Sequence, residues 1–320
     1  MKFKISPIAG DASFRTFYRI VDNKNSRIVV HAKKEKYKNL IIYSAVNSFL
    51  RKNKILAPKL YLHNYKKGIL FIEDFGDLSF LKLLKKSKNK LSVYKKLVEL
   101  LLKIQKIKTK SKIKTNIGKS FRIKKYTAKY LHEESDLFFD WYLPLLFNKK
   151  KTSDIKKKTK KILSNLYNRL NFPNSCIVHR DYHAENLMRV GKKIGVIDSQ
   201  DIIIGNPAYD LVSLIDDVRI KNSNKLKRKI YNFYLKRNIK ISTKDSNKFL
   251  EDFNILSIQR SLKIIGIFSR LWKRDGKTKY LKFIPYTWQI LEMRMKSKNF
   301  QALRKIFNKN ISKKTRKKYT

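Results

Sequence analysis

Short runs of strand-like residues mark the first quarter of the chain, a pattern that is typical of a β-rich lobe. Turn residues such as Asp22–Asn25 separate the apolar runs. Between the second and third runs, the apolar residues of 38–53 recur at helical spacing, which predicts one helix there. The strands are expected at 14–21, 27–32, 59–63 and 68–73.

Beyond this region the apolar positions recur with the period of an α-helix, about 3.6 residues. The clearest apolar stripe lies in 91–106, and the basic, polar stretch 106–120 is predicted to be a loop. Further helices are expected at 78–84, 126–147, 153–170, 208–219, 225–237, 245–271 and 284–307. This order predicts an α+β protein with a small β-rich lobe at 1–76 and a mainly helical lobe at 77–320.

The most informative motif lies in the second of these lobes. His179–Asn186 reads HRDYHAEN, and Asp198 follows on a short apolar strand. This is the order and spacing of the phosphoryl-transfer residues of kinase-like enzymes. We therefore predict a protein-kinase-like fold, with Asp181 as the base that accepts the proton of an attacking hydroxyl and with Asn186 and Asp198 as metal ligands. A turn with a capping Asn is the alternative for any one of these residues, but the whole set in register favours the kinase interpretation.

A nucleotide would need further groups from the β-rich lobe. Ala9–Arg15 places one glycine among small residues before the first convincing strand, where backbone N–H groups can approach phosphates. An ordinary tight turn is the alternative there. The strand that ends near Glu73 and Phe75 could bind an adenine ring, or it could be a plain turn into a helix capped by Asp77. The candidate nucleotide-binding residues are Gly10, Asp11, Ser13, Phe14, Arg15, Glu73 and Phe75.

The phosphate-pairing lysine of protein kinases and its helical glutamate partner are missing from their expected places. His31 stands where the lysine would be, and 38–53 contains no acidic residue. The sequence leaves the positive charge to Lys33, Lys34, Arg15 or Arg19 without choosing among them. This departure argues against a protein kinase. So does the short path from Asp198 to Asp210, a residue that we expect to cap the following helix.

Composition adds an alternative from another class of protein. The chain has 320 residues, 77 Lys and Arg against 24 Asp and Glu, and a net charge of +53. Such a charge is typical of nucleic-acid-binding proteins. However, the lysines are spread over nearly every segment beside abundant Ile and Asn, and all three have A/T-rich codons. Genome base composition is therefore the simpler explanation, and nucleic-acid binding on a degenerate kinase-like fold stays the alternative.

Several features indicate a cytoplasmic protein. The single cysteine, Cys176, excludes an internal disulfide and fits a reducing compartment. Met1–Pro7 lacks the apolar region of a signal peptide. No apolar run approaches the length that crosses a bilayer, so we expect no membrane insertion.

Together these residues resemble the aminoglycoside phosphotransferase/choline kinase superfamily of small-molecule kinases. His179–Asn186, Asp198 and Pro207–Leu211 carry the resemblance. Gln259–Lys277, with Gly10–Arg15, makes the chain similar to one branch, the bacterial anomeric sugar kinases that phosphorylate N-acetylmuramate and N-acetylglucosamine at the 1-position. The resemblance implies ATP, Mg²⁺ and a small hydroxylated acceptor, and it implies the same roles for Asp181, Asn186 and Asp198. Ser199 departs from the phenylalanine that usually follows the metal-binding aspartate.

The acceptor is expected to be a sugar. An aromatic ring such as Trp141 could stack on it, and basic residues could hold a lactyl carboxylate, although a core tryptophan and structural ion pairs are the alternatives. The candidate substrate-binding residues are Glu134, Trp141, Arg260, Arg270 and Arg274. A cationic acceptor such as choline or an aminoglycoside is the other possibility. It would require a cluster of acids, for which Asp216 and Asp217 are the main candidates.

Overall fold

A computed structural model describes residues 4–8, 15–22, 25–32, 36–109, 112–239 and 241–318. The chain folds into two compact units. Unit 1 consists of Met1–Lys124 and Cys176–Ile204, and unit 2 of Lys125–Ser175 and Gly205–Thr320. The β-rich region expected over 1–76 lies within unit 1, and a division of the chain into lobes at residue 76 stays a prediction.

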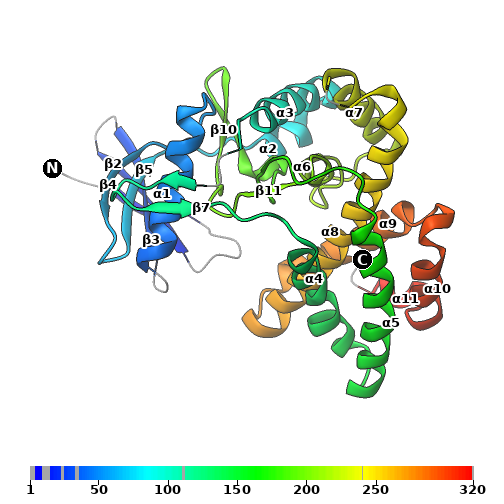
Figure 1. Cartoon of the computed structure of the whole chain (residues 1–320). Helices are drawn as coiled ribbons and strands as arrows, with labels where there is room; N and C mark the ends of the chain where they lie inside the picture. The colour runs from blue at the N-terminus through cyan, green and yellow to red at the C-terminus, as the bar shows by residue number, and fades with distance from the viewer. Residues whose placement is uncertain are drawn as a thin grey trace. The chain divides into compact units, whose positions relative to one another are not determined.

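A five-stranded antiparallel sheet forms the N-terminal part of unit 1 (Figure 1). Its strands are β1 (Lys4–Ile8), β2 (Arg15–Asp22), β3 (Asn25–Ala32), β4 (Leu60–Asn64) and β5 (Ile69–Glu73), in the order β1-β2-β3-β5-β4. The sequence did not predict β1, which contains Pro7. A proline can be accommodated there because β1 lies at the edge of the sheet, where one side needs no hydrogen-bond partner.

Helix α1 (Lys36–Lys52) covers one face of this sheet. Alternate residues of β3 point to that face and are buried against the helix, namely Ile28, Val30 and Ala32. They meet Leu40 and Tyr43 of α1 in one apolar cluster. Successive side chains of β3 thus point in turn to the face of the sheet under α1 and to the opposite face.

The rest of unit 1 consists of helices and pairs of short strands, with a 3-10 turn at Ala184–Asn186. These elements are α2 (Phe80–Lys86), α3 (Lys90–Gln105), β6 (Lys112–Lys114), β7 (Ser120–Arg122), β8 (Cys176–Val178), β9 (Leu187–Val190), β10 (Lys193–Val196) and β11 (Ile203–Gly205). The prediction of a loop over 106–120 was wrong, because β6 pairs with β7 and buries Ile113. The prediction that Asp77 caps α2 was also wrong, because the N-cap is Ser79, whose side chain accepts a hydrogen bond from the Lys82 N–H.

Unit 2 is built of helices, as predicted. They are α4 (Ala128–Leu137), α5 (Lys149–Asn168), α6 (Ala208–Ile215), α7 (Asn224–Arg237), α8 (Ser246–Asp275), α9 (Ile284–Arg294), α10 (Gln301–Asn310) and α11 (Lys313–Arg316). The prediction of one continuous helix over 284–307 was wrong, because Ser297 adopts an extended backbone conformation between α9 and α10. Among the described residues, no helix is both long enough and apolar enough to span a membrane.

The long helix α8 approaches the end of α4 so closely that a glycine is required. A Cβ atom at Gly266 would lie 2.2 Å from the Leu137 carbonyl carbon and 2.5 Å from the Phe138 nitrogen. At this point α4 gives way to a π-helical turn, Phe138–Tyr142. The backbone of α8 at Gly266 therefore packs directly against the backbone at Leu137 and Phe138, with no side chain between them.

A buried carboxylate connects four helices of unit 2. Asp216, at the end of α6, pairs with Lys227 of α7 at 2.7 Å and with Arg294 of α9 at 2.9 Å, and it accepts a hydrogen bond from Ser257 of α8 at 2.7 Å. Burial alone would raise the pKa of Asp216. The charges of Arg294 and Lys227 outweigh burial and hold that pKa well below its usual range.

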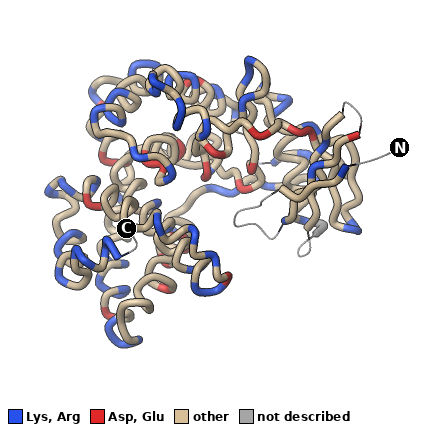
Figure 2. The backbone as a smooth tube through the Cα atoms, turned by 180° about the vertical axis from the view of Figure 1, so that it is seen from behind, with Lys and Arg blue, Asp and Glu red and all other residues tan. Residues whose placement is uncertain are grey.

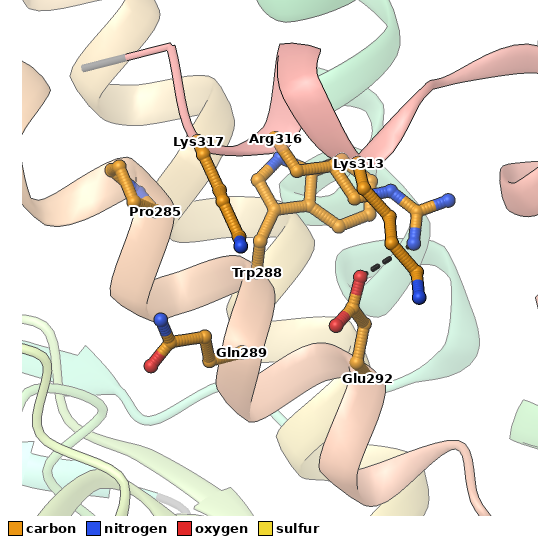
Figure 3. Close-up of a pocket in the computed structure, with 7 residues that line it drawn as sticks. All are labelled: Pro285, Trp288, Gln289, Glu292, Lys313, Arg316 and Lys317. Atoms are coloured by element: carbon orange, nitrogen blue, oxygen red, sulfur yellow. Dashed lines mark hydrogen bonds and ion pairs between the residues drawn. The ribbon is translucent and has the colours of Figure 1, made fainter. Parts of the chain in front are cut away.

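A pocket of about 190 Å³ lies where α11 packs on α9 (Figure 3). Arg316 lies over the ring of Trp288 and pairs with Glu292 at 2.5 Å, which ties the two helices together. None of the residues predicted to take part in catalysis or binding lines this pocket. It is lined by Pro285, Trp288, Gln289, Glu292, Lys313, Arg316 and Lys317.

We expect Gly266→Ala to lower the free energy of unfolding by about 1–3 kcal/mol, because the added Cβ must displace the Leu137 backbone. In an unobstructed helix, alanine would instead stabilise by about 1 kcal/mol relative to glycine, so the sign of the change tests the contact. Urea unfolding followed by circular dichroism measures it. Ser269→Ala on the same helix loses only a hydroxyl bonded to the Ile265 carbonyl. It should change stability by less than about 1 kcal/mol.

Asp216→Asn should lower the free energy of unfolding by about 3–5 kcal/mol, because it leaves two cations without their carboxylate. Since the folded pKa of Asp216 is depressed, its contribution is complete above the unfolded pKa of about 3.9 and is lost as the pH falls below it. The difference between variant and wild type should therefore be constant near neutrality and shrink in acid. The matched control is Asp154→Asn, which breaks an exposed pair with Lys158. An equal effect of the two substitutions in chemical denaturation would contradict the assignment.

Candidate active site

The segment between β8 and β9 forms a tight loop held by its own backbone. The His183 N–H donates to the Asp181 carbonyl at 2.9 Å, and the Asn186 N–H donates to the His183 carbonyl at 3.0 Å. The Asn186 side chain closes the loop, because its Nδ2 donates to the Asp181 carbonyl at 3.0 Å. This bond directs the amide nitrogen into the loop and leaves the amide oxygen as the atom that can bind a metal ion.

Asp198 is held next to this loop. The N–H of Ile197 donates to the Asn186 carbonyl at 3.1 Å, and the Ile197 carbonyl contacts the His179 ring nitrogen at 3.0 Å. Asp198 and Arg180 have positive φ angles of 60° and 74°, although neither is glycine. Such conformations cost about 1–3 kcal/mol each and concentrate at functional sites. The Asp198 side chain is 43% exposed.

Two further contacts anchor the loop to the helices of unit 1. The hydroxyl of Tyr182, which is fully buried, donates to the Leu97 carbonyl of α3 at 2.8 Å. Glu185 accepts a hydrogen bond from Ser79, the N-cap of α2, at 3.2 Å. Sequence reasoning did not identify these anchors, although both lie inside the motif. They limit the movement of the loop that carries Asp181.

The donor set fits Mg²⁺. Asp198 offers a carboxylate and Asn186 an amide oxygen, and Mg²⁺ in nucleotide enzymes is usually held by one or two such groups together with phosphates and water. No group of three or more His, Cys, Asp or Glu side chains suited to a metal ion occurs within the described ranges. When bound, the ion would neutralise charge on the nucleotide phosphates.

Arg15, at the start of β2, points to Asp198. Its Nη2 lies 3.0 Å from the Asp198 carboxylate and its Nη1 donates to Gln200 at 3.1 Å, and the side chain is only 5% exposed. Arg19, four residues further along the strand, instead pairs with Asp74 and Asp77. Hydrogen bonds from Arg19 hold the pKa of Asp77 below its usual range. The remaining candidates for the positive charge, Lys33 and Lys34, lie outside the described residues, as do Gly10, Asp11, Ser13 and Phe14.

Helix α1 contacts the site without any acidic residue. The ring of Tyr43 lies 5.1 Å from the Arg15 guanidinium. Burial raises the pKa of Tyr43 and keeps its phenol neutral. Asn47 accepts a hydrogen bond from Ser199 at 2.7 Å. The serine that departs from the family pattern is therefore buried and bonded to α1.

Glu73 and Phe75 lie at the end of β5 as predicted, and both contact other parts of unit 1. Glu73 accepts hydrogen bonds from Arg51 and from the Lys59 N–H, each at 3.1 Å. The Phe75 ring packs on Gly195, where an added Cβ would lie 2.5 Å from it. A role for Glu73 and Phe75 in nucleotide binding stays a prediction.

Glu134 lies in the interior of unit 2. It accepts hydrogen bonds from Tyr126, from Tyr209 at 3.1 Å and from Gln259 at 3.0 Å, and it pairs with Lys263 at 2.9 Å. Burial raises the pKa of Tyr209 to about 12, so its hydroxyl remains a donor. These contacts join α4, α6 and α8. Binding of a sugar by Glu134 stays a prediction.

The other candidate substrate residues differ in exposure. Arg260 is buried and donates to Ser213 at 2.7 Å. Trp141 is half-buried in the π-helical turn. Arg270 is half-buried on α8, where burial and the charge of Arg274 lower its pKa. Arg274 is exposed and pairs with Asp275 at 2.7 Å. Arg270 and Arg274 lie one helical turn apart, whereas Arg260 belongs to the core.

The chain is similar in sequence to known kinases. The chain is 25% identical over 280 residues to the N-acetylmuramate/N-acetylglucosamine kinase of Caulobacter vibrioides, covering 86% of this chain and 76% of that protein. It is 27% identical over 293 residues to the kinase of the same name from Pseudomonas aeruginosa, covering 90% and 83%.

A solved structure shares the fold. The ADP-bound aminoglycoside phosphotransferase APH(2'')-Ib superposes with a TM-score of 0.60 at 12% identity, covering 93% of this chain and 94% of that one. This likeness confirms the kinase-like fold predicted from the HRDYHAEN motif. The sequence profile of the phosphotransferase enzyme family matches residues 4–239. The resemblance noted in the sequence is therefore confirmed, and the chain belongs to the phosphotransferase enzyme family.

Proposed function

We propose that the protein transfers the γ-phosphoryl group of ATP to a hydroxyl of an N-acetylated amino sugar, namely the anomeric 1-hydroxyl of N-acetylmuramate or N-acetylglucosamine. The main support is the ordered set of Asp181, Asn186 and Asp198 in unit 1. Relatives named as kinases of these two sugars support the choice of acceptor. The proposal places the enzyme in the cytoplasm, where ATP is available, and in the recycling of cell-wall sugars.

In this proposal Asp181 orients the acceptor hydroxyl and takes its proton. General-base catalysis of this kind contributes about 10²–10⁴-fold to the rate. Asn186 and Asp198 would hold Mg²⁺ on the phosphates. The transition state of phosphoryl transfer is loose, so the main task of the protein is to position the groups. The contacts of Tyr182 and Glu185 with α3 and α2 provide that rigidity.

The charges of unit 2 favour a neutral or anionic acceptor over a cationic one. Both acids considered for a cationic acceptor are buried in structural pairs, Asp216 with Lys227 and Arg294, and Asp217 with Arg219. Lys and Arg are distributed over the elements of both units (Figure 2). This distribution does not favour a nucleic-acid ligand, which is usually bound by a clustered basic patch.

The assignment of the base is tested by Asp181→Asn. With Mg-ATP and N-acetylmuramate or N-acetylglucosamine, we expect kcat to fall by about 10²–10⁴-fold, because proton transfer is lost. NMR of the product gives the position of the phosphate. Asp154→Asn, which changes an exposed acid of α5, should retain the wild-type rate. A near-normal kcat in Asp181→Asn would refute the role of Asp181, and phosphorylation of choline or an aminoglycoside alone would refute the acceptor.

Arg270 should distinguish the two sugars. N-acetylmuramate carries a lactyl carboxylate and N-acetylglucosamine does not. If Arg270 binds this carboxylate, Arg270→Met should raise KM for N-acetylmuramate by about tenfold or more, the loss expected for one charged hydrogen bond. KM for N-acetylglucosamine should stay the same, and Arg270→Lys should fall between. Equal changes in KM for both sugars would instead indicate a structural role for Arg270.

A further inference from the structure

We propose that Arg15 replaces the phosphate-pairing lysine of kinases and that Gln200 holds it in place. The cation would come from β2 instead of β3. The inference rests on the proposed function in one respect, namely that the ligand is a nucleoside triphosphate. It does not depend on the identity of the acceptor. Its basis is the register of the sheet and the contacts of the guanidinium.

The register places Arg15 on a face of β3 that carries no charge, whereas His31, where the sequence placed the missing lysine, pairs with Thr16 and lies on the other face. Arg15 lies directly opposite Ala32, and Phe17 lies opposite Val30. Side chains of directly opposed residues lie on the same face of a sheet, about 4.5–5.5 Å apart at Cβ. The residues of β3 on this face are uncharged, namely Ser26, Ile28, Val30 and Ala32. Ala32 is small and fully buried, so the long side chain of Arg15 can extend past it.

The guanidinium already contacts an anion of the site. Its Nη2 is 3.0 Å from the carboxylate of Asp198, the predicted metal ligand. A carboxylate that binds a divalent cation interacts less strongly with a neighbouring arginine. A phosphate oxygen is the anion best able to accept that N–H in its place, since guanidinium groups match phosphates in geometry. Arg15 therefore lies where a nucleotide phosphate would meet it.

Gln200 orients Arg15 without neutralising it. Its Oε1 accepts from the Arg15 Nη1 at 3.1 Å, while its Nε2 donates to Asp201 at 2.9 Å, which fixes the orientation of the amide. In protein kinases a helical glutamate holds the lysine and contributes a negative charge. Here the amide of Gln200 holds Arg15 without adding a negative charge of its own, and the ion pair of Arg15 is with Asp198. The face of Tyr43 supports the guanidinium from α1.

The test measures nucleotide binding by calorimetry in the absence of any acceptor. Arg15→Met should weaken Mg-ATP binding by about 10–100-fold, the loss expected for a charged hydrogen bond, and leave the affinity for adenosine unchanged. Arg15→Lys should lose less, because it keeps the charge. Gln200→Glu should also weaken Mg-ATP binding, since it adds a competing anion. The matched control is Arg27→Met, an exposed arginine of β3 that lies over Tyr61.

The outcomes are distinguishable. Wild-type affinity of Arg15→Met for Mg-ATP would overturn the inference, and so would equal losses for Mg-ATP and adenosine, which indicate damage to the fold. The unfolding temperature without ligand reports such damage directly. If the wild type binds Mg-ATP in an Arg15-dependent way but phosphorylates no sugar, the proposed function fails and the role of Arg15 stands. If sugars are phosphorylated and Arg15→Met binds Mg-ATP normally, only the role of Arg15 fails.

Discussion

The hydrogen bond from the Ile197 N–H to the Asn186 carbonyl is the constraint on which the candidate site depends. It joins two segments that the sequence separates by the β9–β10 hairpin, so that the two predicted metal ligands, Asn186 and Asp198, lie on neighbouring backbone. Asp198, the next residue, has a left-handed backbone conformation with a φ of 60°, of the kind that concentrates at functional sites. Arg15 contacts the Asp198 carboxylate, and Gln200 accepts a hydrogen bond from Arg15.

The segment that relates the chain to sugar kinases is mostly interior. Gln259 and Lys263 bind Glu134, and Gly266 admits the backbone of Leu137. These residues hold α8 against α4 and the turn that follows it. Arg270, farther along α8, is half-buried and is the residue of this segment best placed for a direct role.

The sequence predicted those parts of the fold that depend on local pattern. Strands β2 to β5, most helices and the catalytic loop have strong periodicity or a specific motif. The β6–β7 hairpin was missed because three residues are too few to distinguish a strand pattern from a loop, and β1 was missed because it contains Pro7. The break at Ser297 was missed although residues 296–299, which precede Phe300, are all polar. The choice of Arg15 over Arg19 could not be made, since it depends on strand register and side-chain reach.

The register of Arg15 against Ala32 has a consequence for how kinase genes are sorted. A genome survey that scores a kinase as inactive when β3 lacks its lysine and the first helix lacks its glutamate would discard this chain. If the cation has moved to the adjacent strand, the lysine lost from β3 is replaced by the arginine on β2, and the phosphate-binding charge is kept. To separate inactive kinases from kinases whose cation lies on the neighbouring strand, a survey would then have to compare the paired positions of β2 and β3 together. Either position alone would not be enough.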